Sequence, residues 1–262
     1  MLYDCFPFFN ELDLMEIRLA TLEGVVDRFV IAECPWTHQG REKPLHFAEN
    51  RDRFARWLPM IEHLVIEDRP GPSDPMVLEP FHRECLARGL ALAEPNDLAM
   101  ISDLDEIPSS EAVDEARRII ALEQLTAVSF EQALYYYYAD CYQCQCTGTR
   151  LARVKAVRAI GPQRIRHSDW PVMRRDGEPN WGGWHFSYLG GKAAIRAKTA
   201  AFCHPGCADG KFMSDANLDE ALSTGVDLYG RNADGRFVPV DETWPKHLLA
   251  NRERFAHLIK ET

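Results

Sequence analysis

Hydrophobic positions in the first hundred residues alternate between two patterns. Short apolar runs predict strands, and these runs lie at residues 2–9, 25–32, 63–67 and 98–101. Segments whose apolar residues recur three and four positions apart predict helices, and they lie at residues 10–22, 47–58 and 76–93. The alternation of strands and helices predicts a mainly parallel sheet with helices on both of its faces.

The pattern changes after Pro108. We expect a helix from there to about Glu123, followed by a strand-rich stretch at residues 126–139. Residues 149–165 predict further strands, added to the sheet in antiparallel orientation. No repeat, low-complexity segment or linker divides the chain, so residues 1–262 are expected to form a single domain of the α/β class.

Composition narrows the classes of partner. The hydrophobic content of 46% suffices for a packed core, and the net charge of −10 argues against nucleic acid or an anionic membrane as main partner. The sequence has no run of 18 apolar residues, and its N-terminus lacks the pattern of a signal peptide. We therefore expect a cytoplasmic protein. Peripheral membrane contact stays open, and the sequence does not indicate an oligomeric state.

An acidic cluster follows the apolar run 98–101. Asp103 and Asp105 are two positions apart, so in extended backbone both side chains point to one side. Carboxylate oxygens at the exit of a parallel strand suit a hard divalent cation. The alternative is a solvated turn, with Ser109 or Ser110 capping the next helix. Glu106 completes the cluster.

Two other kinds of acidic site fit less well. An EF-hand loop that starts at Asp103 would need glycine and glutamate where the chain has Pro108 and Asp114. A phosphatase that forms an aspartyl phosphate usually has a small residue and a hydroxyl soon after its aspartates, where this chain has residues 106–108, Glu-Ile-Pro. Two interpretations of the acidic cluster therefore remain, a cation site and a solvated turn.

Two further groups of residues have a chemical and a structural interpretation. Cys141, Cys144 and Cys146, with Cys203 or Cys207, could bind zinc, although reduced thiols in an apolar setting are favoured. Residues 180–188 combine a glycine pair with Trp184 and His185, an aromatic face and a titratable ring. Flat aromatic rings suit the C–H faces of sugars, but for this stretch taken alone a turn followed by a strand with aromatic core residues is favoured.

Several segments in the same order resemble glycosyltransferase family 17, whose best-known members are the bisecting β-1,4-N-acetylglucosaminyltransferases of animal N-glycans. The resemblance spans roughly residues 3–230 and is carried by residues 3–14, 26–33, 102–108, 183–187 and 198–204. It implies a single domain of the GT-A type, a mainly parallel sheet flanked by helices with a smaller antiparallel part on the acceptor side. The nucleotide-binding half would be about 1–108 and the acceptor-side half about 109–262.

The resemblance also implies a reaction. It is the metal-dependent, inverting transfer of a sugar from a UDP-sugar to a hydroxyl of a glycan or lipid-linked saccharide. The resemblance, rather than any residue of the chain, implies that the sugar is N-acetylglucosamine. Mn²⁺ or Mg²⁺ would offset the charge of the departing diphosphate. Without a recognisable membrane anchor or secretory signal, a role in polysaccharide biosynthesis is expected. The alternatives are a non-catalytic glycan-binding protein on the same fold and a metal-dependent phosphatase or nucleotidyltransferase.

Site residues follow from the matched positions. Asp105 is expected to bind the metal directly and Asp103 to contact the ribose or the ion, while His204 is either a third ligand or a structural histidine. Donor contacts are expected from the remaining strand-end, aromatic and basic candidates, Glu33, Arg83, Trp184 and Lys198. Inversion needs a general base, for which the candidates are His185, Glu106, Glu131 and Asp215.

Overall fold

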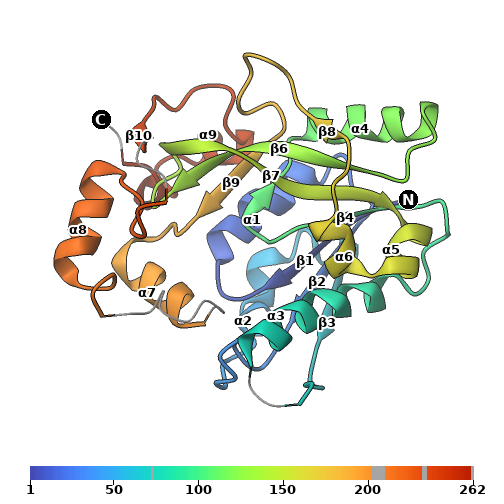
Figure 1. Ribbon diagram of the computed structural model, residues 1–262, viewed down its shortest axis with the longest axis horizontal. Helices are drawn as coiled ribbons and strands as arrows, with labels where there is room; N and C mark the ends of the chain where they lie inside the picture. The colour runs from blue at the N-terminus through green and yellow to red at the C-terminus, as the bar shows by residue number, and fades with distance from the viewer. Residues whose placement is uncertain (72–73, 202–209, 232–234, 261–262) are drawn as a thin grey trace.

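The computed structural model describes residues 1–71, 74–201, 210–231 and 235–260 (Figure 1). Within them a ten-stranded sheet has the main order β3-β2-β1-β4-β7-β6-β9-β5. The first four strands of this order are mutually parallel, and they are β3 (Ile61–Val65), β2 (Arg28–Glu33), β1 (Leu2–Phe8) and β4 (Leu98–Ile101). The parallel half predicted from the sequence is confirmed.

Helices cover both faces of this half. One face packs on α1 (Leu12–Leu22), α2 (His46–Glu49) and α4 (Ser110–Leu122), and the other packs on α3 (Pro75–Glu84), α5 (Val154–Ile160) and α6 (Pro162–His167). Neighbouring β1 residues such as Cys5 and Phe6 enter opposite cores, so both are fully buried. Burial on both faces explains why the strands are continuous apolar runs.

The second half of the sheet is mixed. β7 (Cys141–Arg153) runs antiparallel to β4 and to β6 (Ala127–Tyr136), which pairs in parallel with β9 (Trp184–Ser187). The short strands β5 (Glu106–Ile107), β8 (Val172–Met173) and β10 (Arg236–Phe237) pair with β9, β6 and β7. Three helices follow, α7 (Gly191–Ala201), α8 (Asp215–Thr224) and α9 (Lys246–Ala250). The chain is thus a mixed α/β fold whose mostly parallel sheet is flanked by helices.

Two sequence predictions about elements are wrong in part. Of the strand region predicted at 149–165, residues 149–153 do belong to antiparallel β7, but residues 154–165 form the short helices α5 and α6. Val154 and Val157 of α5 and Ile165 of α6 pack into one core. The helix predicted at 76–93 ends at Glu84 and continues as 3₁₀ turns over Cys85–Leu90. There Gly89 lies so close to β2 that a Cβ atom would meet Val30 Cγ1 at 2.3 Å. No described helix has the length and apolar character needed to span a membrane.

One buried ion pair joins β1, α1 and the loop after β4. Arg18 of α1 is fully buried, and its guanidinium donates to both carboxylate oxygens of Asp4 at 2.5 and 2.7 Å. The same group donates to Ser102 Oγ and to the carbonyl oxygens of Asp103, Leu104 and Glu106. Every guanidinium nitrogen of Arg18 therefore has an acceptor, as a buried charge requires.

We predict that Arg18→Met lowers the free energy of unfolding by about 3–5 kcal/mol, because it leaves the Asp4 carboxylate buried and unpaired. The double variant Asp4→Leu/Arg18→Met should be more stable than Arg18→Met, because no buried charge remains. Urea denaturation checks both values, with Arg118→Met on the exposed face of α4 as a control within about 0.5 kcal/mol of the wild type. A loss of less than 1 kcal/mol for Arg18→Met would contradict this role.

Candidate active site

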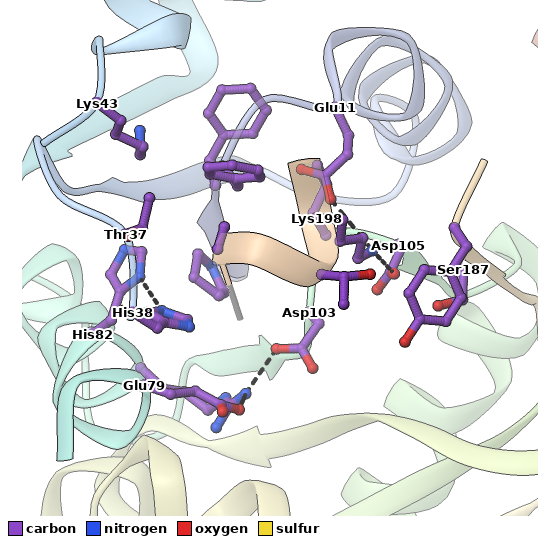
Figure 2. A pocket seen from close by; sticks show the side chains of 18 of the residues that line it. Glu11, Thr37, His38, Lys43, Glu79, His82, Asp103, Asp105, Ser187 and Lys198 are labelled. Atoms are coloured by element: carbon purple, nitrogen blue, oxygen red, sulfur yellow. Dashed lines mark hydrogen bonds and ion pairs between the residues drawn. The ribbon is translucent and has the colours of Figure 1, made fainter. Parts of the chain in front are cut away.

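A cavity opens at the carboxyl ends of the parallel strands, where open α/β sheets bind ligands (Figure 2). Its walls come from the ends of β1 and β9, the loops after β2 and β4, α3 and α7. The lining residues that carry chemistry are Glu11, Trp36, Thr37, His38, Lys43, Glu79, His82, Arg83, Asp103, Asp105, His185, Ser187, Tyr188 and Lys198. Of the sequence-predicted site residues, the structure brings Arg83, Asp103, Asp105, His185 and Lys198 together here.

Asp103 enters the cavity from the loop after β4. Its carboxylate is 37% exposed, accepts a 2.9 Å hydrogen bond from Arg83 and lies 3.8 Å from Arg166. Burial disfavours the charged form of Asp103, but the positive charges of Arg83 and Arg166 outweigh it and hold the pKa of this carboxyl well below its ordinary value. Asp103 is therefore an anion at neutral pH.

Asp105 lies deeper in the same cavity. Lys198 of α7 donates to one carboxylate oxygen at 2.6 Å (Figure 2). His185 Nε2 of β9 lies 3.6 Å from the other oxygen. Burial disfavours the charged form of each group, but the attraction between the opposite charges is the larger effect. This attraction lowers the pKa of Asp105 and raises the pKa values of His185 and Lys198. The arrangement keeps one anion between two cations.

Glu106 lies behind the cavity wall and is 2% exposed. Its carboxylate pairs with Arg166 and accepts from the backbone N–H of Asp103 at 3.1 Å. In register, Glu106 is paired with His185 across β5 and β9. The placement does not match the catalytic role predicted for Glu106, because both oxygens serve to hold the loop and Arg166. We therefore regard it as a positioning residue.

The glycine pair before β9 has a steric purpose. A Cβ atom on Gly182 would lie 1.9 Å from the carbonyl oxygen of Glu131, and one on Gly183 would lie 2.2 Å from that of Ile107. Gly183 also has a φ of +115°, which other residues rarely adopt. The pair lets β9 insert between β6 and β5 and so brings His185 to Asp105.

The sequence profile of glycosyltransferase family 17 matches residues 1–231. The chain belongs to glycosyltransferase family 17. It is 25% identical over 285 residues to human beta-1,4-mannosyl-glycoprotein 4-beta-N-acetylglucosaminyltransferase, and 24% identical over 286 residues to the rat enzyme of that name. These alignments cover 95% and 96% of the chain. The chain spans about half the length of these curated relatives, 53% of each.

Solved structures resemble this family 17 chain more distantly. Crystal structures of S. aureus TarS 1-349, alone and in complex with UDP-GlcNAc, give TM-scores of 0.45 and 0.42 at 9% and 10% identity. Both alignments cover 85% of this chain and 72% of the TarS chain. Similarity at this level adds no argument about the site.

Two predicted donor contacts lie elsewhere in the structure. Glu33 is fully buried, accepts from the backbone N–H of Phe47 and lies within ion-pair distance of Lys43 and His63. The Glu33 carboxylate thus holds the loop after β2 and does not face the cavity. It does position Lys43, and Lys43 lines the cavity. Trp184 points to the opposite face of β9 from His185, as alternation along a strand dictates.

Other predicted residues lie apart from the cavity or outside the described residues. Glu131 lines a shallow surface hollow, and Asp215 begins α8, where it pairs with Arg196 at 2.8 Å. His204 lies outside the described residues, as do Cys203 and Cys207. The expected helix cap is present, because Ser109 accepts from the backbone N–H of Ala112 at the start of α4.

Sequence reasoning missed several residues of the cavity. Trp36 and Thr37 follow β2, and Glu11 precedes α1, so each stands just beyond a strand in the parallel half. The position of a residue just after a parallel strand is the feature of the sequence that could have indicated these three.

Arg166, which pairs with Glu106 behind the cavity wall, could not be found in the same way, because a helix sequence does not indicate a partner sixty residues earlier in the chain.

The described residues contain no cluster of three or more histidine, cysteine, aspartate or glutamate side chains able to hold a metal. Asp103 and Asp105 nevertheless offer two carboxylates that face one cavity. Mg²⁺ is typically held in this way, by one or two carboxylates completed by substrate phosphates and water. Cys141, Cys144 and Cys146 lie on β7 as reduced cysteines, and the described part of the chain assembles no metal site around them.

Two histidines beside the cavity make the stability of the folded protein depend on pH. His82 Nε2 lies 3.0 Å from the Ala32 carbonyl oxygen, and its Nδ1 lies 3.3 Å from His38 Nε2. Burial lowers the pKa of His82 to about 3 and that of His38 to about 4, and the positive charges of Lys43 and Arg83 act in the same direction on both rings. Both rings are therefore neutral in the folded protein when the unfolded chain, with an ordinary pKa of about 6.5, is protonated.

We predict that the free energy of unfolding falls as pH drops from about 6.5 toward 4, because the unfolded state binds up to two more protons. The slope from these two rings is at most about 2.7 kcal/mol per pH unit. Urea denaturation at pH 7, 6 and 5 checks it. The variant His82→Gln, which keeps an amide donor for Ala32, should show a shallower slope, and an unchanged slope would contradict the assignment.

Proposed function

We propose that this chain transfers N-acetylglucosamine from UDP-N-acetylglucosamine to a saccharide hydroxyl, with a divalent cation and with inversion at the anomeric carbon. Membership of family 17 and the names of the curated relatives support the sugar and the reaction class. The observation that carries the proposal is the cavity, where Asp103 and Asp105 meet Arg83 of α3 and Lys198 of α7 at the carboxyl ends of the strands. A nucleotide diphosphate needs this combination of charges.

The cations of the cavity suit a departing diphosphate. The Arg83 side chain is 4% exposed and is held by Asp103, Glu79 and Gln163, so it presents a charge of fixed position. Lys198 approaches the same region from the opposite wall. Such preorganised charges stabilise negative charge that develops in the transition state without the cost of reorganising solvent.

Asp103 and Asp105 are the residues that would hold Mn²⁺ or Mg²⁺. A bound divalent cation would offset negative charge on the diphosphate as it leaves. The two aspartates keep their negative charges at neutral pH because protein cations lower their pKa values. The backbone of their loop is fixed by Arg18, which accounts for their defined direction into the cavity.

Two residues of the cavity are candidates for the general base that inversion needs. His185 lines the cavity beside Asp105 and keeps the role assigned from the sequence, since Glu131 and Asp215 lie outside and Glu106 is enclosed. Asp105 alone keeps this ring protonated, but a divalent cation bound at Asp105 would oppose that effect, lower the pKa of His185 and leave the ring able to accept a proton. Glu11 is a second candidate, because its carboxylate lines the cavity and lies 3.3 Å from Lys198.

We predict that Asp105→Asn lowers the rate of UDP release from UDP-N-acetylglucosamine with Mn²⁺ by at least about 100-fold, because a developing charge loses its electrostatic support. Wild-type protein should gain thermal stability from the donor only with metal. Asp114→Asn, on exposed α4, is the matched control and should behave as wild type. Phosphate release from simple esters, or metal-independent glycan binding without turnover, would overturn the transferase proposal in favour of a phosphatase or a glycan-binding protein.

His185→Asn separates two roles for this ring. If His185 accepts the acceptor's proton, kcat falls by about 10²–10⁴-fold while the KM for UDP-N-acetylglucosamine changes by no more than a few-fold. That is the expected result. Steady-state kinetics with His257→Asn, an exposed histidine that pairs with Asp13, provide the control. A raised KM with unchanged kcat would show instead that His185 only supplies charge for donor binding.

A further inference from the structure

A second cavity lies on the other side of β9. Its volume is about 820 Å³, against about 240 Å³ for the cavity at Asp105. Segments 177–181 and 236–247 form its outer walls, and α1, the start of α4 and strands β6, β7 and β9 form its floor. The larger of the two cavities is therefore the one that the proposed transfer reaction does not use.

The two cavities are separated by one strand. Side chains alternate along β9, so His185 and Ser187 face the first cavity, whereas Trp184 faces the second. Trp181, from the turn before β9, also lines the second cavity. The aromatic motif at residues 180–188 is thus divided between two sites, and its tryptophans do not belong to the catalytic one.

Aromatic side chains dominate the floor of the second cavity. They are Tyr135, Tyr142, Trp181, Trp184 and Trp244. The indole N–H of Trp244 donates to the Ala139 carbonyl oxygen at 2.9 Å, whereas those of Trp181 and Trp184 are buried with no acceptor. Both of these residues are more than 90% buried. The indole nitrogens themselves are enclosed, so a ligand in the cavity would meet carbon atoms of these rings rather than their N–H groups.

The polar groups of this cavity favour a neutral ligand with hydroxyls. Asp241, Glu242 and Thr243 stand exposed along its outer wall, and Glu111 and Glu178 add negative charge nearby. The basic residues among its lining are outnumbered, so a nucleotide or another anion would be repelled. Carboxylates accept hydrogen bonds from sugar hydroxyls, and aromatic rings cover their C–H faces.

We propose that the second cavity binds a neutral oligosaccharide, separately from the transfer site. Its volume lies within the range of about 300–1,000 Å³ that is usual for small-ligand sites. The outer wall at residues 236–247 lies beyond residues 1–231, the part matched by the family profile, so the family assignment does not account for this site. The binding does not depend on donor chemistry, and the site can hold a glycan that the enzyme is extending or has extended.

Calorimetric titration with triacetylchitotriose and with cellotriose, in saturating UDP and Mn²⁺, tests the proposal. We expect binding that persists when UDP fills the first cavity. Trp181→Phe and Trp184→Phe each keep an aromatic ring but remove part of the apolar surface that lines the cavity, and should weaken saccharide affinity about 3- to 10-fold. Ala20→Phe, which fills the cavity from α1, should abolish binding.

The matched control is Trp36→Phe. Trp36 is as deeply buried as Trp181, at 6% exposure, but it lines the first cavity. This change should weaken UDP binding and leave saccharide affinity unchanged, the reverse of Trp181→Phe. Three results would overturn the proposal. The saccharide could compete with UDP, its affinity could be unchanged by both tryptophan substitutions, or neither probe could bind at concentrations up to about 10 mM. None of these results bears on whether the first cavity transfers sugar.

Discussion

The buried ion pair between Arg18 and Asp4 is the interaction on which the site depends. A charge without solvent exposure persists only if all of its donors find acceptors, and Arg18 finds them in β1 and in the loop after β4. Three backbone carbonyl groups of that loop converge on one guanidinium. The requirement to satisfy Arg18 therefore fixes the backbone of the loop, and with it the direction of Asp103 and Asp105.

Charge pairing extends the same principle outward. Asp103 pairs with Arg83 of α3, Asp105 with Lys198 of α7 and Glu106 with Arg166 of α6. Each acid of the cluster thus recruits a cation from a different helix, and the three helices are held around the end of β4. In a protein with a net charge of −10, this is how positive charge is concentrated at one place on the sheet. The outcome is a cavity in which carboxylates and fixed positive charges stand side by side, as the proposed nucleotide-sugar donor requires.

Much of the fold and the centre of the site could be predicted from the sequence. Apolar runs and helical spacing locate the parallel half because each strand there is buried on both faces. The position of Asp103 and Asp105 after such a strand then places them at the ligand-binding edge. Helices α5 and α6 were mistaken for strands because each is short, at 7 and 6 residues, and helical periodicity needs a longer window to be distinguished.

The direction of single side chains could not be predicted. One step along β9 decides whether a residue enters the first cavity, like His185, or the second cavity, like Trp184, and the sequence alone does not fix the register. Glu33 faces the core for the same reason, where Lys43 and the Phe47 N–H compensate its charge. Partners such as Arg166 come from distant segments, so only the tertiary structure reveals them.

A crystal structure of the chain with UDP and Mn²⁺ would test the central claim most directly. The account predicts metal density between Asp103, Asp105 and the diphosphate, with phosphate oxygens within hydrogen-bond distance of Arg83 and Lys198. UDP bound in the second cavity, or a diphosphate that contacts neither the aspartates nor these cations, would contradict it.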